Sequence, residues 1–258
     1  MTTTAQMKNR YALITGGSTG IGAAIAGELA RHGANLVLVA RSPETLEKTA
    51  STLRERHGAA VLTVPLSLDE HDAPGQLLRT VHEAGIEVET LVNSVGLSSR
   101  GMVADSDPRL LRQLVDLNVG AVTELTTMLV TRMVDRGHGS IVNIASTGAY
   151  APAPQVAAYA ASKAYVLSFT QALWAETRHT GVRVVAVSPG PTQTPMSSGP
   201  GRNKRQPVQV ARTALAALGA SGPAVIDGSS NKVTAAVIRH LPTRAMAPLA
   251  ARFMARRG

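Results

Sequence analysis

A short apolar run at residues 11–15 leads directly into a glycine-rich turn, and a helical pattern follows the turn. The glycines are Gly16, Gly20 and Gly22, and apolar residues then recur at helical spacing over residues 23–31. Glycines let the backbone turn tightly and approach a pyrophosphate, which the amino end of a helix attracts. The order of strand, glycine turn and helix therefore predicts a phosphate-binding loop, although a turn that merely joins strand to helix would look similar.

Apolar runs and helical patterns continue to alternate along the chain. Further strands are predicted at residues 35–40, 60–64, 88–92, 140–145, 182–187 and 224–226. Helices are predicted between them, at residues 43–57, 69–84, 107–135, 159–178 and 207–218. No hairpin turn joins the strands, which is typical of a parallel sheet covered on both faces. We therefore expect residues 1–258 to form one α/β domain, a Rossmann-type doubly wound parallel sheet of about seven strands.

Composition indicates a globular protein and excludes several kinds of site. Hydrophobic residues make up 44% of the 258 residues and charged residues 17%, as in a chain with a substantial core. Cysteine is absent, which excludes disulfides and thiol catalysis, and we expect no metal site. The first ten residues lack a signal-peptide core, and no apolar run approaches the ~18 residues of a membrane span. We therefore expect a cytoplasmic protein.

The net charge of +9 is unevenly distributed. Residues 231–258 contain six basic and no acidic residues, and Arg202, Lys204 and Arg205 form a second basic group. Such charge could attract nucleic acid, anionic lipid or an acidic partner. No aromatic stacking residues or zinc ligands accompany it. We therefore expect no nucleic-acid binding, and we favour a solvated surface over contact with a membrane.

The second predicted strand is followed by Arg41 and Ser42, about 20 residues after the glycine turn. In a dinucleotide-binding fold, an acidic residue here binds the 2′-hydroxyl of the adenosine ribose, whereas an arginine accommodates a 2′-phosphate. No carboxylate occurs before Glu44. We therefore predict NADP(H) rather than NAD(H) as the cofactor; the alternative is that Arg41 only ends the strand at the surface.

Tyr159 and Lys163 lie four residues apart at the start of a predicted helix, and so on one helical face. A free tyrosine keeps its proton up to a pKa of about 10. A nearby lysine charge favours the phenolate and lowers that pKa, which makes the pair a candidate proton donor and acceptor. Alone, the same spacing also fits an exposed lysine beside a packed tyrosine, so its meaning depends on the other motifs.

Together, the motifs resemble the short-chain dehydrogenase/reductase family, in its classical, NADP-preferring form. The resemblance covers about residues 11–196. The motifs that carry it are Thr15-Gly-Gly-Ser-Thr-Gly-Ile-Gly22, Asn93-Ser-Val-Gly96, Asn118, Ser146, Tyr159-x-x-x-Lys163 and Pro189-Gly190. Each motif is a weak signal, whereas all of them in this order leave little room for coincidence.

The resemblance implies four catalytic residues. Tyr159 would be the general acid in reduction and the base in oxidation, while Lys163 would lower its pKa and bind the nicotinamide ribose. Ser146 would place the substrate oxygen, and Asn118 would hold a water that links Lys163 to solvent. Taken singly, Ser146 and Asn118 could equally serve local capping or backbone hydrogen bonds. The cofactor would supply hydride, and the protein would orient the carbonyl and stabilise its oxyanion.

The resemblance also implies a set of cofactor-binding residues at the glycine turn, the strand ends and the Pro189-Gly190 turn. They are Gly16, Ser18, Thr19, Gly20, Ile21, Gly22, Arg41, Ser42, Leu66, Asn93, Ser94, Val95, Gly96, Tyr159, Lys163, Pro189, Gly190, Thr192 and Thr194. The chain departs from the family where Ser94 replaces a common asparagine. It also has no acid at residues 65–67, where an aspartate often contacts adenine, so a backbone contact at Leu66 is expected instead.

The substrate is expected above the carboxyl ends of the strands, where the loops gather. Met102, Tyr150 and Met196 suggest an apolar pocket there, although ordinary loop packing explains them equally well. Residues 191–206 are interpreted as a mobile lid, whose cations either receive an anionic handle or form a solvated face. A basic helical tail at about residues 229–258 is expected to dock on the protein, and we expect a homodimer while leaving a tetramer open.

The leading hypothesis is an NADPH-dependent oxidoreductase that transfers hydride between NADP(H) and a small carbonyl or alcohol substrate. Within that class we favour a ketoreductase with Tyr159 as general acid and base. The alternatives are a non-catalytic NADP-binding regulatory module and a reductase of an imine, an enone or a lipid-associated substrate. Replacement of Tyr159, Lys163 or Ser146 by another residue type would have favoured the regulatory module, but all three are present.

Overall fold

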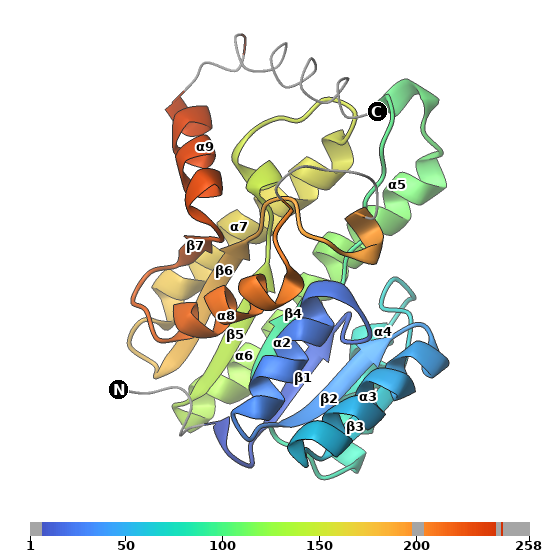
Figure 1. Ribbon diagram of the computed structural model, residues 1–258, viewed down its shortest axis with the longest axis vertical. Helices are drawn as coiled ribbons and strands as arrows, with labels where there is room; N and C mark the ends of the chain where they lie inside the picture. The colour runs from blue at the N-terminus through green and yellow to red at the C-terminus, as the bar shows by residue number, and fades with distance from the viewer. Residues whose placement is uncertain (1–6, 198–203, 241–243, 245–258) are drawn as a thin grey trace.

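The computed structural model describes residues 7–197, 204–240 and 244, and its centre is a parallel sheet (Figure 1). The strands run in the order β3-β2-β1-β4-β5-β6-β7. They are β1 (Tyr11–Thr15), β2 (Asn35–Ala40), β3 (Val61–Pro65), β4 (Val88–Asn93), β5 (Gly139–Ile144), β6 (Val182–Ser188) and β7 (Ala224–Ile226). The predicted doubly wound α/β sheet is confirmed.

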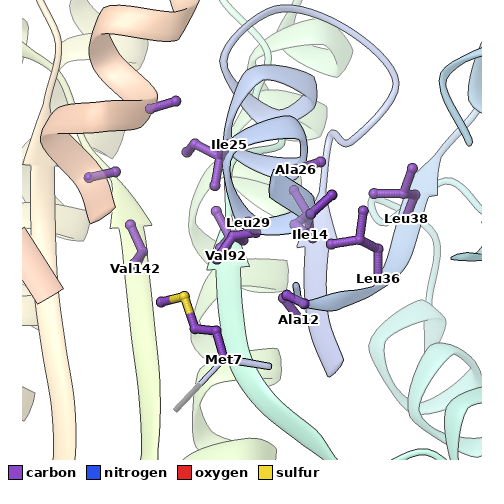
Figure 2. Packing of buried hydrophobic residues seen from close by; sticks show 14 of the residues in the cluster. Met7, Ala12, Ile14, Ile25, Ala26, Leu29, Leu36, Leu38, Val92 and Val142 are labelled. Carbon is purple, nitrogen blue, oxygen red and sulfur yellow. The ribbon is translucent and has the colours of Figure 1, made fainter. Parts of the chain in front are cut away.

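Helices cover both faces of this sheet, so the strands are buried on both sides. One face packs against α2 (Gly20–Arg31), α3 (Pro43–His57) and α8 (Pro207–Leu218). The other packs against α4 (Ala73–Glu83), α6 (Ala121–Arg136) and α7 (Ala157–Thr177). Figure 2 shows Ile25 and Leu29 of α2 beside the strand residues Ile14 and Val92, with Met7 near Val142 at the lower end. Alternate strand residues point to opposite faces, and this places Leu13 in the other core.

The strand order reverses between β1 and β4, so the loops after these two strands diverge and leave a crevice at the carboxyl edge. The loops touch at their base. The Thr15 hydroxyl oxygen accepts hydrogen bonds from the backbone N–H groups of Ser94 and Val95, at 3.1 and 3.2 Å. Gly16 has a φ of +68°, and a Cβ there would lie 3.0 Å from the backbone of Val95. The fold therefore brings the glycine turn and the Asn93–Gly96 segment together.

The helix predicted over residues 107–135 is interrupted in the structure. It consists of α5 (Pro108–Val115), a π-helical turn η2 (Asp116–Gly120) and α6. A π turn inserts one extra residue per turn, and such turns are frequent at functional sites. By length and composition the stretch Pro108–Arg136 could also cross a membrane, with a mean hydropathy of 1.2. Its inner residues Leu125 and Met133 are buried in the core against the sheet, as in a core helix.

Other boundaries differ from the prediction for local reasons. The helix predicted from residue 69 begins at Ala73, because Pro74 fits only the first turn of a helix. In the predicted lid, a short 3₁₀ turn η4 (Pro195–Ser197) is present, and residues 198–203 lie outside the described residues. The first tail helix is α9 (Ser229–His240), and the rest of the predicted tail, apart from residue 244, also lies outside them. Figure 1 shows α9 beyond the carboxyl end of β7.

The glycines of α2 allow a matched test of the turn. A Cβ at Gly22 would overlap the carbonyl oxygen of Gly16, whereas a Cβ at Gly27 would lie 3.8 Å from the Leu53 side chain. Gly22→Ala should therefore lower the free energy of unfolding by about 1–3 kcal/mol and weaken dinucleotide binding. Gly27→Ala should raise it by about 0.5–1 kcal/mol. Urea unfolding and cofactor titration measure both; a Gly22→Ala variant that behaves like Gly27→Ala would refute the assigned packing.

Candidate active site

The start of α7 places Tyr159 and Lys163 beside the carboxyl end of β5. Lys163 is 5% exposed, and its Nζ donates a hydrogen bond of 2.8 Å to the carbonyl oxygen of Ile144, the last residue of β5. The Tyr159 ring centroid lies 6.0 Å from the same Nζ. Ser146 follows β5 by two residues, and its hydroxyl is hydrogen-bonded to the Tyr159 side chain. The structure thus brings together three of the four residues expected to be catalytic.

The electrostatics of this group differ from the sequence expectation. Burial raises the pKa of Tyr159 and outweighs the hydrogen bond from Ser146, which acts in the opposite direction. Burial also lowers the pKa of Lys163 to about 8. Lys163 was expected to lower the pKa of Tyr159; instead its ammonium group is bonded to Ile144, and desolvation dominates at the phenol. Tyr159 is therefore protonated at neutral pH, and its raised pKa makes it a weaker proton donor than a free tyrosine.

Asn118 lies in the π turn η2 and is fully buried. Its Oδ1 accepts from the Leu97 N–H at 2.8 Å, and its Nδ2 donates to the Leu97 carbonyl at 2.9 Å and to Ser162 Oγ at 3.0 Å. A Cβ at Gly96 would lie 3.3 Å from Asn118 Oδ1 and 3.6 Å from Lys163 Nζ. Asn118 therefore ties the loop after β4 to α7, next to Lys163. Its water-holding role stays a prediction.

The glycine turn forms a cradle at the amino end of α2. Its Gly16 and Gly20 have φ of +68° and +58°, and Thr49 Oγ1 of α3 donates to the Ser18 carbonyl at 2.9 Å. The side chain of Thr19, the N-cap residue of α2, accepts no hydrogen bond from the first turn of the helix. Backbone N–H groups of that turn can therefore donate hydrogen bonds to an anion. Thr194 lies against this turn, since a Cβ at Gly20 would be 3.2 Å from its Cγ2. The cradle, with Ile21 and Gly22 in the first turn of the helix, fits a pyrophosphate.

Arg41 is exposed where β2 ends, in the place expected for a residue that meets a 2′-phosphate. Its neighbour Ser42 caps α3, accepting from the Thr45 N–H at 3.3 Å. Sequence reasoning missed Asp69, which lies near this end of the crevice. Burial acts to raise the pKa of Asp69, but hydrogen bonds from Ser67 and Gln113 and the charge of Arg41 together lower it.

Asn93 has a buried side chain that serves the fold rather than facing the crevice. Its Nδ2 donates to Thr126 Oγ1 at 3.0 Å and to Asn143 Oδ1 at 2.9 Å. Asn143 in turn donates to Thr170 Oγ1 at 3.0 Å. This chain of polar groups links β4 and β5 to α6 and α7. Sequence analysis did not identify Asn143 or Thr170, because nothing local marks a polar residue in an apolar strand as one end of a network.

The Pro189-Gly190 turn faces the loop after β5. The Thr147 N–H donates to the Pro189 carbonyl at 2.9 Å, and Thr192 Oγ1 donates to the Gly190 carbonyl at 2.9 Å. Tyr150, expected to touch the substrate, is within 3.2 Å of Ser188 Oγ, hydroxyl to hydroxyl. This contact joins the loop after β5 to the end of β6.

The other two residues expected at the substrate lie at the surface. Met102 is 59% exposed and Met196 is 54% exposed. The structure does not enclose them in a pocket of the described residues.

A cavity of about 490 Å³ lies along Val182–Val185 of β6, between the last turns of α7 and α8, at the opposite end of the strand from Ser188. That cavity is therefore not part of this site. Leu66 is half-buried just after β3, and its expected backbone contact with the cofactor stays a prediction.

Comparison with known proteins gives one consistent family. The family model for short chain dehydrogenase matches residues 10–205. An uncharacterized oxidoreductase of Staphylococcus saprophyticus is 32% identical over 83% of this chain and 92% of its own. The very-long-chain 3-oxoacyl-CoA reductase of Anas platyrhynchos is 32% identical over 81% of this chain and 69% of its own. A short-chain dehydrogenase from Sphingobium yanoikuyae, solved with NADPH, has a TM-score of 0.80 at 29% identity, covering 94% and 93% of the two chains.

The buried Lys163 predicts a characteristic pH dependence of stability. Because burial lowers its pKa to about 8 from 10.5, the unfolded chain binds this proton more tightly than the folded chain does. The free energy of unfolding should therefore be lower below pH 8 and rise between about pH 8 and 10.5. Chemical denaturation across this range should show a smaller rise in Lys163→Met than in the wild type.

Lys48, exposed on α3, provides the matched control. Lys48→Met should keep the wild-type rise, because its ammonium group is solvated in both states. The assigned burial of Lys163 would be contradicted if Lys163→Met and Lys48→Met had the same dependence of unfolding free energy on pH.

Proposed function

The chain belongs to the short-chain dehydrogenase family of oxidoreductases, and from that premise we propose that it is an NADPH-dependent ketone reductase. One observation carries the proposal: Tyr159 is hydrogen-bonded to Ser146 beside the buried Lys163, at the edge where the glycine turn opens. Such a group can donate a proton to a carbonyl oxygen while a hydride reaches the carbon. All the catalytic side chains that the family motif requires are present.

The crevice fits NADP(H) on several independent grounds. The glycine turn leaves room for a pyrophosphate at the uncapped amino end of α2. Arg41 is exposed at the end of β2, where a 2′-phosphate would need a cation. The Pro189-Gly190 turn contacts the loop after β5, and Thr194 lies against the glycine turn. The related dehydrogenase from Sphingobium yanoikuyae was solved with NADPH. When bound, the cofactor would supply the hydride.

The chain's own residues would handle the oxygen and the proton. Ser146 would hold the carbonyl oxygen beside the Tyr159 hydroxyl, and both would stabilise the negative charge that develops there. Tyr159 would then pass its proton to that oxygen. With a pKa near 8, Lys163 is largely protonated at neutral pH, so its charge can stabilise the resulting phenolate. In the reverse direction Tyr159 would accept the proton of an alcohol.

We propose a ketone with a large apolar substituent as the substrate. Met102, Val103 and Met196 expose large apolar side chains in the segments that follow β4 and β6, where a substrate could contact them. Related proteins include a very-long-chain 3-oxoacyl-CoA reductase. Consumption of NADPH should be faster with such ketones than with small polar ketones, and equal rates would contradict the proposed substrate class.

Tyr159→Phe tests the assigned acid. The variant should bind NADPH as the wild type does and should lose turnover by about 10²–10⁴-fold, because it lacks the proton to donate. Tyr165→Phe is the control, since Tyr165 lies on the same helix but is exposed and bonded to Thr123 Oγ1 at 2.9 Å. Retained turnover in Tyr159→Phe would remove this residue from the mechanism.

Arg41→Asp tests the cofactor preference. A carboxylate in this position repels a 2′-phosphate and can accept a hydrogen bond from the 2′-hydroxyl, so the ratio of kcat/KM for NADPH to that for NADH should fall by at least about tenfold. Arg56→Asp changes the same charge on the exposed face of α3 and should leave the ratio unchanged. An unaltered ratio in Arg41→Asp would exclude Arg41 from cofactor selection.

A further inference from the structure

The segment at residues 188–194, here called the nicotinamide turn, is packed against the first turn of α9. A Cβ at Gly190 would overlap the side chain of Asn231, so the amide group of Asn231 lies directly on the backbone of the turn. Asn231 Nδ2 donates to the carbonyl oxygen of Asp227 at 2.7 Å, which fixes the orientation of the amide. Asn231, in the first turn of α9, therefore forms one wall of the turn.

Asp227 is the centre of this support and has no exposed surface. Its carboxylate accepts from both Nε and Nη2 of Arg205, the latter at 2.9 Å, and from Thr213 Oγ1 at 2.6 Å. Its backbone N–H donates to the carbonyl oxygen of Ser188 at 3.1 Å. Burying a carboxylate is costly unless it is paired and fully hydrogen-bonded, so Asp227 ties Arg205 firmly to the end of β6.

Arg205 holds the nicotinamide turn from its other side through the backbone. Its N–H donates to the Pro191 carbonyl, and its carbonyl accepts from the Gln193 N–H, both at 2.9 Å. These two bonds form a parallel bridge between Arg205 and Thr192. The guanidinium group that sequence analysis left open as an anionic-handle receptor is thus paired with Asp227. The turn is clamped between Arg205 and Asn231, and both residues meet at Asp227.

We propose that Asp227, Arg205 and Asn231 are positioning residues for the nicotinamide end of the cofactor. They act through residues 188–194 and hold the backbone of the turn at the distance from Tyr159 that hydride transfer requires. The inference rests on the proposed NADPH-dependent function. Arg41, at the end of β2, supports the adenosine end from outside the clamp, whereas Thr194 of the nicotinamide turn lies against Gly20 of the glycine turn. Loosening the clamp should therefore affect the nicotinamide end more than the adenosine end.

The experiment compares two ligands by calorimetry: NADPH and 2′-phospho-ADP-ribose, which lacks the nicotinamide ring. In Asn231→Ala and Asp227→Asn, the Kd for NADPH should rise about tenfold, while the Kd for the fragment should stay within about twofold of wild type. The kcat for ketone reduction should fall by about 10²-fold, because a small misplacement of the ring disrupts hydride transfer. A purely structural role would weaken both ligands together.

Two further variants guard against general destabilisation. Thr213→Val removes one hydrogen bond to Asp227 and keeps its ion pair, so it provides a milder loss if Asp227→Asn does not fold. Glu28→Gln removes another buried carboxylate charge, which is paired with Arg31 and Arg212 away from the turn. Glu28→Gln should leave the ratio of the two Kd values at the wild-type level, and Thr213→Val should raise it in the same direction as Asn231→Ala.

The outcomes separate this inference from the function on which it rests. If the wild type binds both ligands and Asn231→Ala binds them with unchanged affinities, the inference is overturned and the proposed function stands. The inference would also be overturned if Glu28→Gln changed the ratio of the two Kd values as much as Asn231→Ala does. If the wild type binds neither ligand, the proposed function fails, and the inference fails with it.

Discussion

The site depends on the burial of one ammonium group, that of Lys163, at the end of β5. A buried cation is unfavourable unless it is hydrogen-bonded, and the Ile144 carbonyl meets that need at 2.8 Å. The same bond fixes the first turns of α7 to the sheet, so Tyr159, one turn earlier, is held beside Ser146. Desolvation then sets both pKa directions, lowering that of Lys163 and raising that of Tyr159. These pKa directions thus follow from packing rather than from the pairing of the two residues.

The surrounding structure keeps this arrangement in place through polar groups inside the layers. Asn93 and Asn143 join β4 and β5 to α6 and α7, so α7 cannot shift along the sheet without breaking buried hydrogen bonds. The π-helical turn η2 orients the side chain of Asn118 so that it is hydrogen-bonded to Leu97 and Ser162. At the other side of the crevice, the clamp on the nicotinamide turn uses the same principle, with a buried carboxylate that is satisfied by side chains from distant segments.

Much of this could be predicted from the sequence, because local signals mark it. Pro43 and Gly58 bound α3, and Pro207 begins α8, so both helices were predicted with their observed limits. Glycine spacing identified the cradle, and the joint motifs identified Tyr159, Lys163 and Ser146. The remaining features depend on distant contacts. The pKa direction of Tyr159, the inward side chain of Asn93 and the pairing of Arg205 with Asp227 each follow from which segments the fold packs together.

The proposed function requires this site to move a hydride from NADPH to a ketone carbon. The most direct measurement uses NADPH deuterated at C4, prepared separately with the label on each face, and analyses the alcohol product by mass spectrometry. We expect deuterium to reach the carbinol carbon from one of the two preparations only, because the nicotinamide turn would present one face of the ring to the substrate. Oxidation of NADPH without deuterium in the alcohol from either preparation would contradict it.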